Sequence, residues 1–150
     1  MSLNFRRIRI EDIHRLFVVR AATRENPLSQ HQLAQMGVTP GALRQGFEQQ
    51  KLCGWVCLGE GQIIGFCTAD LTTGEVLVLA LLPDYEGQGI GRQLLNRVVT
   101  ELKHAGRTSI WLSADSNPSV RAHGFYRRLG WRPTGELLVN GDEILKLAVV

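Results

Sequence analysis

The segment from Pro83 to Arg92 holds the residue pattern best suited to chemistry, because glycines alternate at positions 87, 89 and 91. Where side chains are missing, backbone N–H groups can converge on an anion. An apolar run precedes the segment and a helical pattern follows it. The free N–H groups and the positive dipole end of a helix start would then face the same anion. A strand, a glycine-rich turn and a helix start together predict a phosphate-binding site.

Two well-known nucleotide motifs do not fit this loop. A dinucleotide fingerprint requires G-x-G-x-x-G, but the sixth position counted from Gly87 is Arg92. A P-loop requires Gly-Lys followed by Ser or Thr, and no Lys-Ser or Lys-Thr pair follows here. From the glycines alone, two interpretations remain: a cradle for the pyrophosphate of coenzyme A, and a tight turn with no ligand.

Hydrophobic patterning places the loop between two long elements. Residues 75–82 are nearly all apolar, which predicts a central strand covered on both faces. Residues 89–105 carry apolar side chains at helical spacing, and Gly106 ends that helix.

The remaining patterns predict an α/β fold over a single domain, 1–150. Upstream they indicate a strand at 5–10, a helix from position 13 to Asn26-Pro27, helices at 30–36 and 41–49, and a hairpin of strands 55–58 and 63–67. Downstream they indicate a strand at 109–112, a helix at 120–129, and closing strands at 137–138 and 144–150. The predicted order is β-α-α-β-β-β-α-β-α-β-β, a mixed central sheet with helices on both faces. The turn-rich stretch 26–40 is a candidate substrate-side loop.

Composition narrows the class of protein. A net charge of +3 suits a small anionic ligand and is weak for a nucleic-acid binder, so we expect no nucleic-acid partner. No apolar run approaches the ~18 residues of a spanning helix, and the N-terminus lacks a signal-peptide core, so we expect no membrane partner. Cys53, Cys57 and Cys67 form no C-x-x-C pair, and no metal-ligand spacing occurs. We therefore expect no metal, and buried, reduced cysteines in a cytoplasmic protein.

The stretch 79–95 resembles the acetyl-CoA motif of the GNAT N-acetyltransferases, whose signature is Gln/Arg-x-x-Gly-x-Gly/Ala after an apolar strand. The match runs from Glu86 to Gly91, with one departure: Glu86 stands where Gln or Arg is typical. A second block, 122–131, resembles the family element A-x-x-[FL]-Y-x-x-x-G-[FW]. The blocks lie in the family's order, and the predicted elements fit the family over essentially the whole chain.

The resemblance implies acetyl-CoA as co-substrate and assigns residues to it. The strand before the loop would offer backbone groups of Leu79, Ala80 and Leu81 to the pantetheine arm. Backbone N–H groups would hold the pyrophosphate, from Gly87, Gln88, Gly89, Ile90, Gly91 and Arg92. The Arg92 side chain either reaches a phosphate or is simply exposed. Many members carry an asparagine seven residues before the motif tyrosine. Ser119 stands there in this chain, so the usual side-chain contact to CoA is either absent or made by Asn117.

The resemblance also implies catalytic roles. Tyr126 would donate a proton to the departing CoA thiolate, which suits a phenol with an ordinary pKa of about 10. The alternative is a tyrosine that only packs beside Phe125. Glu75, eleven residues before Glu86, would be the general base. Asp70, Asp115 and an amine that arrives already neutral are the other options.

The implied function is direct transfer, through a tetrahedral intermediate, from acetyl-CoA to a primary amine of an unidentified small molecule, peptide or protein. Acceptor specificity would lie in 24–50 and in the closing strands. Dimers are common in the family, so a homodimer is open. The alternative is a non-catalytic acyl-CoA-binding or regulatory module on the same fold.

Overall fold

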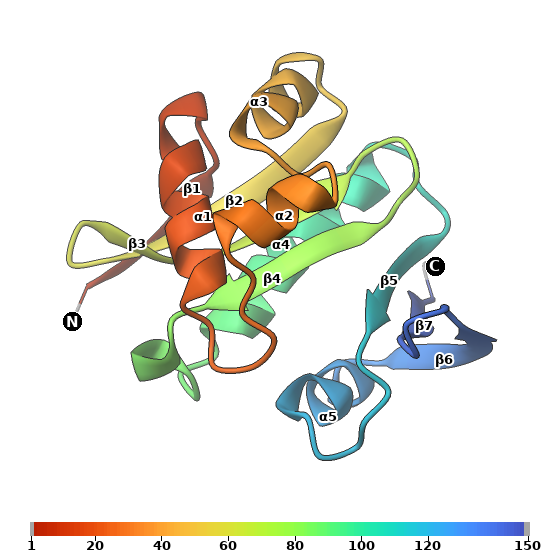
Figure 1. Ribbon diagram of the computed structural model, residues 1–150. Coiled ribbons are helices and arrows are strands. Elements are labelled where there is room, and N and C mark those ends of the chain that lie inside the picture. The colour runs from red at the N-terminus through yellow and green to blue at the C-terminus, as the bar shows by residue number, and fades with distance from the viewer. Residues whose placement is uncertain (1, 149–150) are drawn as a thin grey trace.

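The chain folds into two antiparallel sheets that meet at one point (Figure 1). The computed structural model describes residues 2–148. The first sheet has the order β1-β2-β3-β4, with β1 Leu3–Arg7, β2 Leu52–Gly59, β3 Gln62–Asp70 and β4 Val76–Leu81. The second has the order β5-β7-β6, with β5 Ile110–Ala114, β6 Trp131–Leu137 and β7 Glu143–Leu147.

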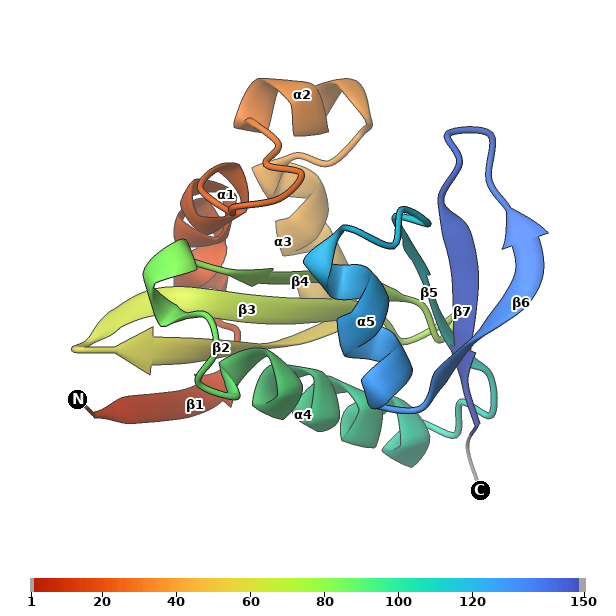
Figure 2. The ribbon, with the colours of Figure 1, turned by 90° about the horizontal axis from the view of Figure 1, so that it is seen from below.

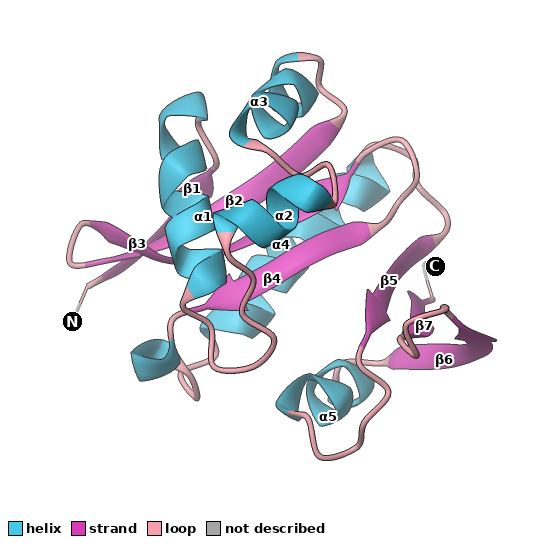
Figure 3. Cartoon of the chain, in the orientation of Figure 1, coloured by secondary structure: helices cyan, strands magenta, loops and turns pink. Residues whose placement is uncertain are grey.

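Helices cover both faces of the first sheet. On one face lie α1 Ile13–Ala21, α2 Gln30–Gln35 and α3 Pro40–Glu48 (Figure 3). On the other lies α4 Ile90–His104, with α5 Arg121–Arg128 beside it (Figure 2). Two 3₁₀ turns, η1 Ile10–Asp12 and η2 Pro83–Tyr85, precede α1 and α4. The predicted α/β class, with helices on both faces, is confirmed.

The region before β2 contains three helices, although the predicted order counts two. All three predicted helix starts are present, and the caps explain two of them. The Ser29 hydroxyl accepts from the backbone N–H of Gln32, and the Thr39 hydroxyl accepts from that of Ala42. Gly37, at φ 82°, separates α2 from α3.

The predicted apolar stripe of α4 forms the centre of the core. Its six buried residues are at most 7% exposed: Ile90, Leu94, Leu95, Val98, Val99 and Leu102. They pack against the first sheet and hold the start of α4 in a fixed place. Among the described residues, no helix combines the length and apolar character needed to cross a membrane.

The prediction that 75–82 is covered on both faces is wrong at Leu77, which is 43% exposed. The reason is that Leu77 lines a cavity that α1, α2 and α3 leave open over this part of β4. At its edge, β4 is joined to β5 through a single parallel bridge, between Glu75 and Trp111. Beyond that bridge the two strands diverge (Figure 1). The mixed character of the sheet rests on this one bridge.

The last two strands differ from their predicted bounds. β6 begins at Trp131, six residues before the predicted strand. The prediction missed these residues because Arg-Pro-Thr-Gly-Glu has low strand propensity. β7 ends at Leu147, and the predicted strand end at Val149 and Val150 lies outside the described residues.

Candidate active site

The glycine loop leaves open space beside its backbone. Gly87 and Gly89 have φ angles of 80° and 79°, a region that favours glycine, and Gly89 is the N-cap of α4. A Cβ built on either residue would meet no atom within 4 Å. No side chain caps this helix start. Its first N–H groups, from Ile90 to Arg92, are therefore free to bind an anion the size of a diphosphate.

Glu86 does not face this site as an isolated carboxylate. It accepts hydrogen bonds from Arg24, at 2.9 Å, and from Arg121. Its side chain is only 16% exposed, whereas the two arginines are largely exposed. Glu86 itself adds no positive charge at this position, but it holds two guanidinium groups beside the loop. Sequence analysis missed both arginines, since the three residues are far apart in the chain and share no motif.

The edge of β4 that faces β5 is the second part of the site. Beyond the Glu75 bridge this edge has no strand partner in the described chain, so its backbone groups are free to pair with an extended ligand. Leu79, Ala80 and Leu81 lie along it, as predicted.

A β-bulge in β4 was missed by the sequence analysis. Val78 pairs with Thr68 and Val76 pairs with Ala69, so Leu77 is an extra residue with no partner. Bulges turn backbone and side chains away from the regular ladder, and they recur next to active sites. A continuous apolar run such as 75–82 carries no signal for a bulge.

Tyr126 is buried on α5, with 9% of its surface exposed. Its ring makes edge contacts with Phe125 and Trp131, at centroid distances of 5.2 and 6.0 Å. Its hydroxyl has no hydrogen-bond partner among residues 2–148. Burial raises the pKa of this phenol well above its usual value, so it stays protonated at neutral pH. Packing holds the ring in place, and the hydroxyl makes no hydrogen bond to the described protein. The hydroxyl is therefore available to donate a proton.

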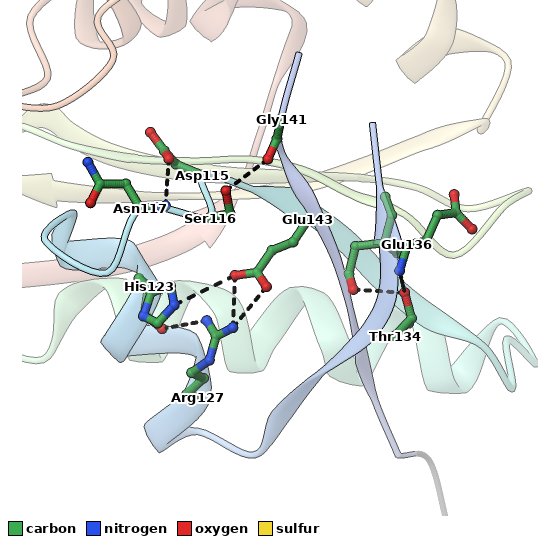
Figure 4. Close-up of polar contacts among 10 residues, drawn as sticks. Asp115, Ser116, Asn117, His123, Arg127, Thr134, Glu136, Gly141 and Glu143 are labelled. Carbon is green, nitrogen blue, oxygen red and sulfur yellow. Dashed lines mark hydrogen bonds and ion pairs between the residues drawn. The ribbon is translucent and has the colours of Figure 1, made fainter. Parts of the chain in front are cut away.

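An ion pair ties α5 to the second sheet (Figure 4). Nη2 of Arg127 donates to both carboxylate oxygens of Glu143, at 2.8 and 2.9 Å. Nε2 of His123 lies 3.9 Å from the same carboxylate, which is mostly buried at the start of β7. These contacts fix the helix that carries Tyr126. They also engage the guanidinium of Arg127, whose side chain is only partly exposed.

Replacing Glu143 with glutamine should weaken this anchor. We expect Glu143→Gln to lower the free energy of unfolding by about 1–2 kcal/mol, because a mostly buried charged hydrogen bond is lost. Urea denaturation measures the change. The matched control is Glu48→Gln, which breaks the exposed Arg44–Glu48 pair and should cost less than about 0.5 kcal/mol. Equal losses in both variants would show that the Glu143 contact is not an anchor.

The three candidate carboxylates differ in their surroundings. Glu75 is half-buried where β4 meets β5, and its pKa is raised by burial and by the nearby Asp70. For Asp70, burial alone would raise the pKa, but hydrogen bonds from Thr72 and Thr73 outweigh it and the pKa is lowered. Asp115 is exposed and accepts from the Asn117 backbone N–H (Figure 4). Glu75 is the best placed of the three to act as a base.

Two predicted cofactor contacts are less constrained. Oδ1 of Asn117 accepts from the N–H and the hydroxyl of Ser119, at 3.0 and 2.9 Å, so only its amide nitrogen is free for a ligand. Arg92 is exposed in the first turn of α4, with no hydrogen-bond partner for its side chain among the described residues. Both assignments stay predictions.

A loop at a helix start, an open strand edge beside it and a tyrosine on the neighbouring helix are the arrangement that the resemblance to the GNAT family predicts for an acetyl-CoA site. A family model described as the acetyltransferase (GNAT) family matches residues 12–131. The chain therefore belongs to the GNAT acetyltransferase family.

Similar proteins agree with this assignment. The [ribosomal protein bS18]-alanine N-acetyltransferase of Haemophilus influenzae is 35% identical over 72 residues, 47% of this chain and 48% of that protein. The mycothiol acetyltransferase of Corynebacterium aurimucosum is 38% identical over 60 residues, 39% of this chain and 19% of that protein. The alignments thus span about half of these relatives or less.

Solved structures share the fold. The PaiA N-acetyltransferase of Thermoplasma acidophilum, in complex with coenzyme A, superposes with a TM-score of 0.82 at 22% identity, over 99% of this chain and 100% of that one. A GNAT-family protein of Desulfovibrio desulfuricans gives 0.81 at 16% identity, again over 99% and 100%.

Proposed function

We propose that the chain is an N-acetyltransferase that moves an acetyl group from acetyl-CoA to a primary amine of a small molecule or peptide. The observation that carries the proposal is the open backbone at Gly87 and Gly89, directly before α4 and beside the free edge of β4. The names of the relatives, a ribosomal-protein alanine N-acetyltransferase and a mycothiol acetyltransferase, support it.

The residues present suit each part of acetyl-CoA. The diphosphate would bind the N–H groups of the loop and of the first turn of α4, with Arg24, Arg92 and Arg121 adding positive charge nearby. The pantetheine arm would pair with the β4 edge at 79–81. Side-chain atoms of Leu79 and Phe125 lie within 3.9 Å of the position that a Cβ on Gly91 would take. Strand β4 and the helices α4 and α5 therefore meet at this place.

The chemistry follows from these positions. The neutral amine attacks the thioester carbonyl, so a C–N bond forms and the C–S bond breaks. Glu75 takes the amine proton through a water, and Tyr126 gives a proton to the departing thiolate. The backbone at the Leu77 bulge would stabilise negative charge on the carbonyl oxygen.

Release of free CoA tests the function against its alternative. The protein is mixed with acetyl-CoA and a panel of primary amines, and thiol appearance is followed. An enzyme should release CoA faster with at least one amine. A binding or regulatory module on this fold would bind acetyl-CoA and show the same slow release with every amine.

Glu75→Gln tests the base. An alkylamine with a pKa of about 10 is nearly all protonated at about pH 7, so loss of the acceptor should lower kcat/KM there and cost less at about pH 9. Because burial raises the pKa of Glu75, the wild-type kcat/KM should rise with pH through a value above 4.5. Asp115→Asn is the control and should keep the wild-type profile. A Glu75→Gln pH profile that overlays the wild type would exclude Glu75.

A cytoplasmic location is part of the proposal. Cys53, Cys57 and Cys67 are buried free thiols, as predicted. Burial raises the pKa of Cys53 to about 12, so this thiol is unreactive at neutral pH. Such thiols suit a reducing compartment.

A further inference from the structure

A second opening lies on the helical face of the first sheet, away from the glycine loop. It is a cavity of about 380 Å³ between α1, α2, α3 and the strands β3 and β4. Its walls are almost wholly apolar and include Leu16, Phe17, Leu33, Met36 and Leu43. The volume is at the small end of the range of ligand pockets, which suits a small molecule.

The cavity shares strand β4 with the proposed transfer site. Leu77 and Val78 line it, and Leu77 is the extra residue of the β4 bulge, 43% exposed. A molecule in the cavity can therefore present an amine at the strand along which the thioester is proposed to lie. The residues 28–43 that line it also fall within the stretch expected to control specificity.

Arg20 is the charged residue in this apolar lining. Its Nη1 donates to the carbonyl oxygen of Asn26 at 2.6 Å, but its Nε is buried without a partner among the described residues. No carboxylate of the described chain pairs with it, and burial lowers its pKa. The Arg20 side chain is half-buried, and a guanidinium without a carboxylate partner in an apolar lining is stabilised when an anion binds it.

We propose that the acceptor is a free α-amino acid with an apolar side chain. The side chain occupies the cavity, the carboxylate binds Arg20, and the amine points to the bulge at Leu77. This inference rests on the proposed acetyl transfer and adds the substrate class. Polyamines are disfavoured, because the lining offers no carboxylate and Arg20 repels a second positive charge.

The wild-type protein tests the class directly. With saturating acetyl-CoA, CoA release is measured for L-leucine, L-serine, spermidine and isoamylamine, which is leucine without its carboxylate. We expect kcat/KM for leucine to exceed that for each of the others by roughly 10-fold or more. Serine or spermidine turned over as well as leucine would overturn the inference. Isoamylamine turned over as well as leucine would overturn the role of the carboxylate.

Arg20→Met tests the anchor. It should lower kcat/KM for leucine far more than for isoamylamine, so that their ratio falls from roughly 10 or more to about 1. Lys103→Met, on an exposed lysine in the last turn of α4 outside the cavity lining, is the control and should keep the wild-type ratio. Calorimetry with acetyl-CoA verifies that each variant is folded. An unchanged ratio in Arg20→Met contradicts the inference. Turnover of no amine at all, with acetyl-CoA bound, contradicts the proposed function instead.

Discussion

Gly89→Val is expected to abolish measurable acetyl-CoA binding. The open space beside this backbone is where the diphosphate would lie, and an isopropyl group would fill it. The φ of 79° also resists a β-branched residue, so the loop would have to move away from the geometry that directs its N–H groups. Isothermal titration calorimetry with acetyl-CoA measures the effect.

The backbone strain that a valine causes at a position with positive φ needs a control of its own. Gly106, at the far end of α4, has φ 85° and equally open surroundings. Gly106→Val should therefore show a similar loss of stability in thermal denaturation and keep the wild-type acetyl-CoA affinity. If Gly89→Val binds acetyl-CoA as the wild type does, the diphosphate is not held by this loop.

Tyr126→Phe is expected to lower kcat by roughly 10- to 1000-fold with little change in acetyl-CoA affinity. The substitution keeps the ring contacts with Phe125 and Trp131 and removes only the hydroxyl, which has no partner in the described chain. Steady-state kinetics on an accepted amine, together with calorimetry, separates kcat from binding.

Tyr85→Phe is the matched control, since Tyr85 is the other tyrosine of the chain and lies on η2. It should change kcat by less than about twofold. Because the pKa of Tyr126 is raised, ionisation of this acid should not lower kcat until the pH is well above the ordinary 10.0. An unchanged kcat in Tyr126→Phe would leave Tyr126 as a packing residue.

The parts of the fold that depend on local patterns could be predicted from the sequence. The stripe of α4 and the caps at Ser29 and Thr39 are local signals, and the structure confirms the helices they predict. β6 was largely missed, because it is an exposed strand whose pairing with β7 outweighs its weak strand propensity. The exposure of Leu77 depends on how α1, α2 and α3 pack over β4, which no pattern within 75–82 records.

The candidate site also has a part that depends on a local motif and a part that depends on contacts between residues far apart in the chain. The glycine loop is a local motif, so its place before α4 was predicted correctly, whereas the binding of a phosphate by its residues stays a prediction. The bridge that joins Glu86 to Arg24 and Arg121 spans 62 and 35 positions of the chain, and only the fold brings these residues together. Arg20 was missed for a related reason, since its burial depends on how α1 packs against its neighbours.

Acetyl transfer is tested most directly by measuring both products at once. The protein is incubated with acetyl-CoA and a mixture of primary amines, and free CoA and acetylated amine are quantified by mass spectrometry. We expect one acetylated amine for each CoA released, dependent on both substrates, with no acetyl group left on the protein and no product with Gly89→Val. Tight binding of acetyl-CoA with no acetylated amine and no faster CoA release would contradict catalysis and identify the chain as a binding module.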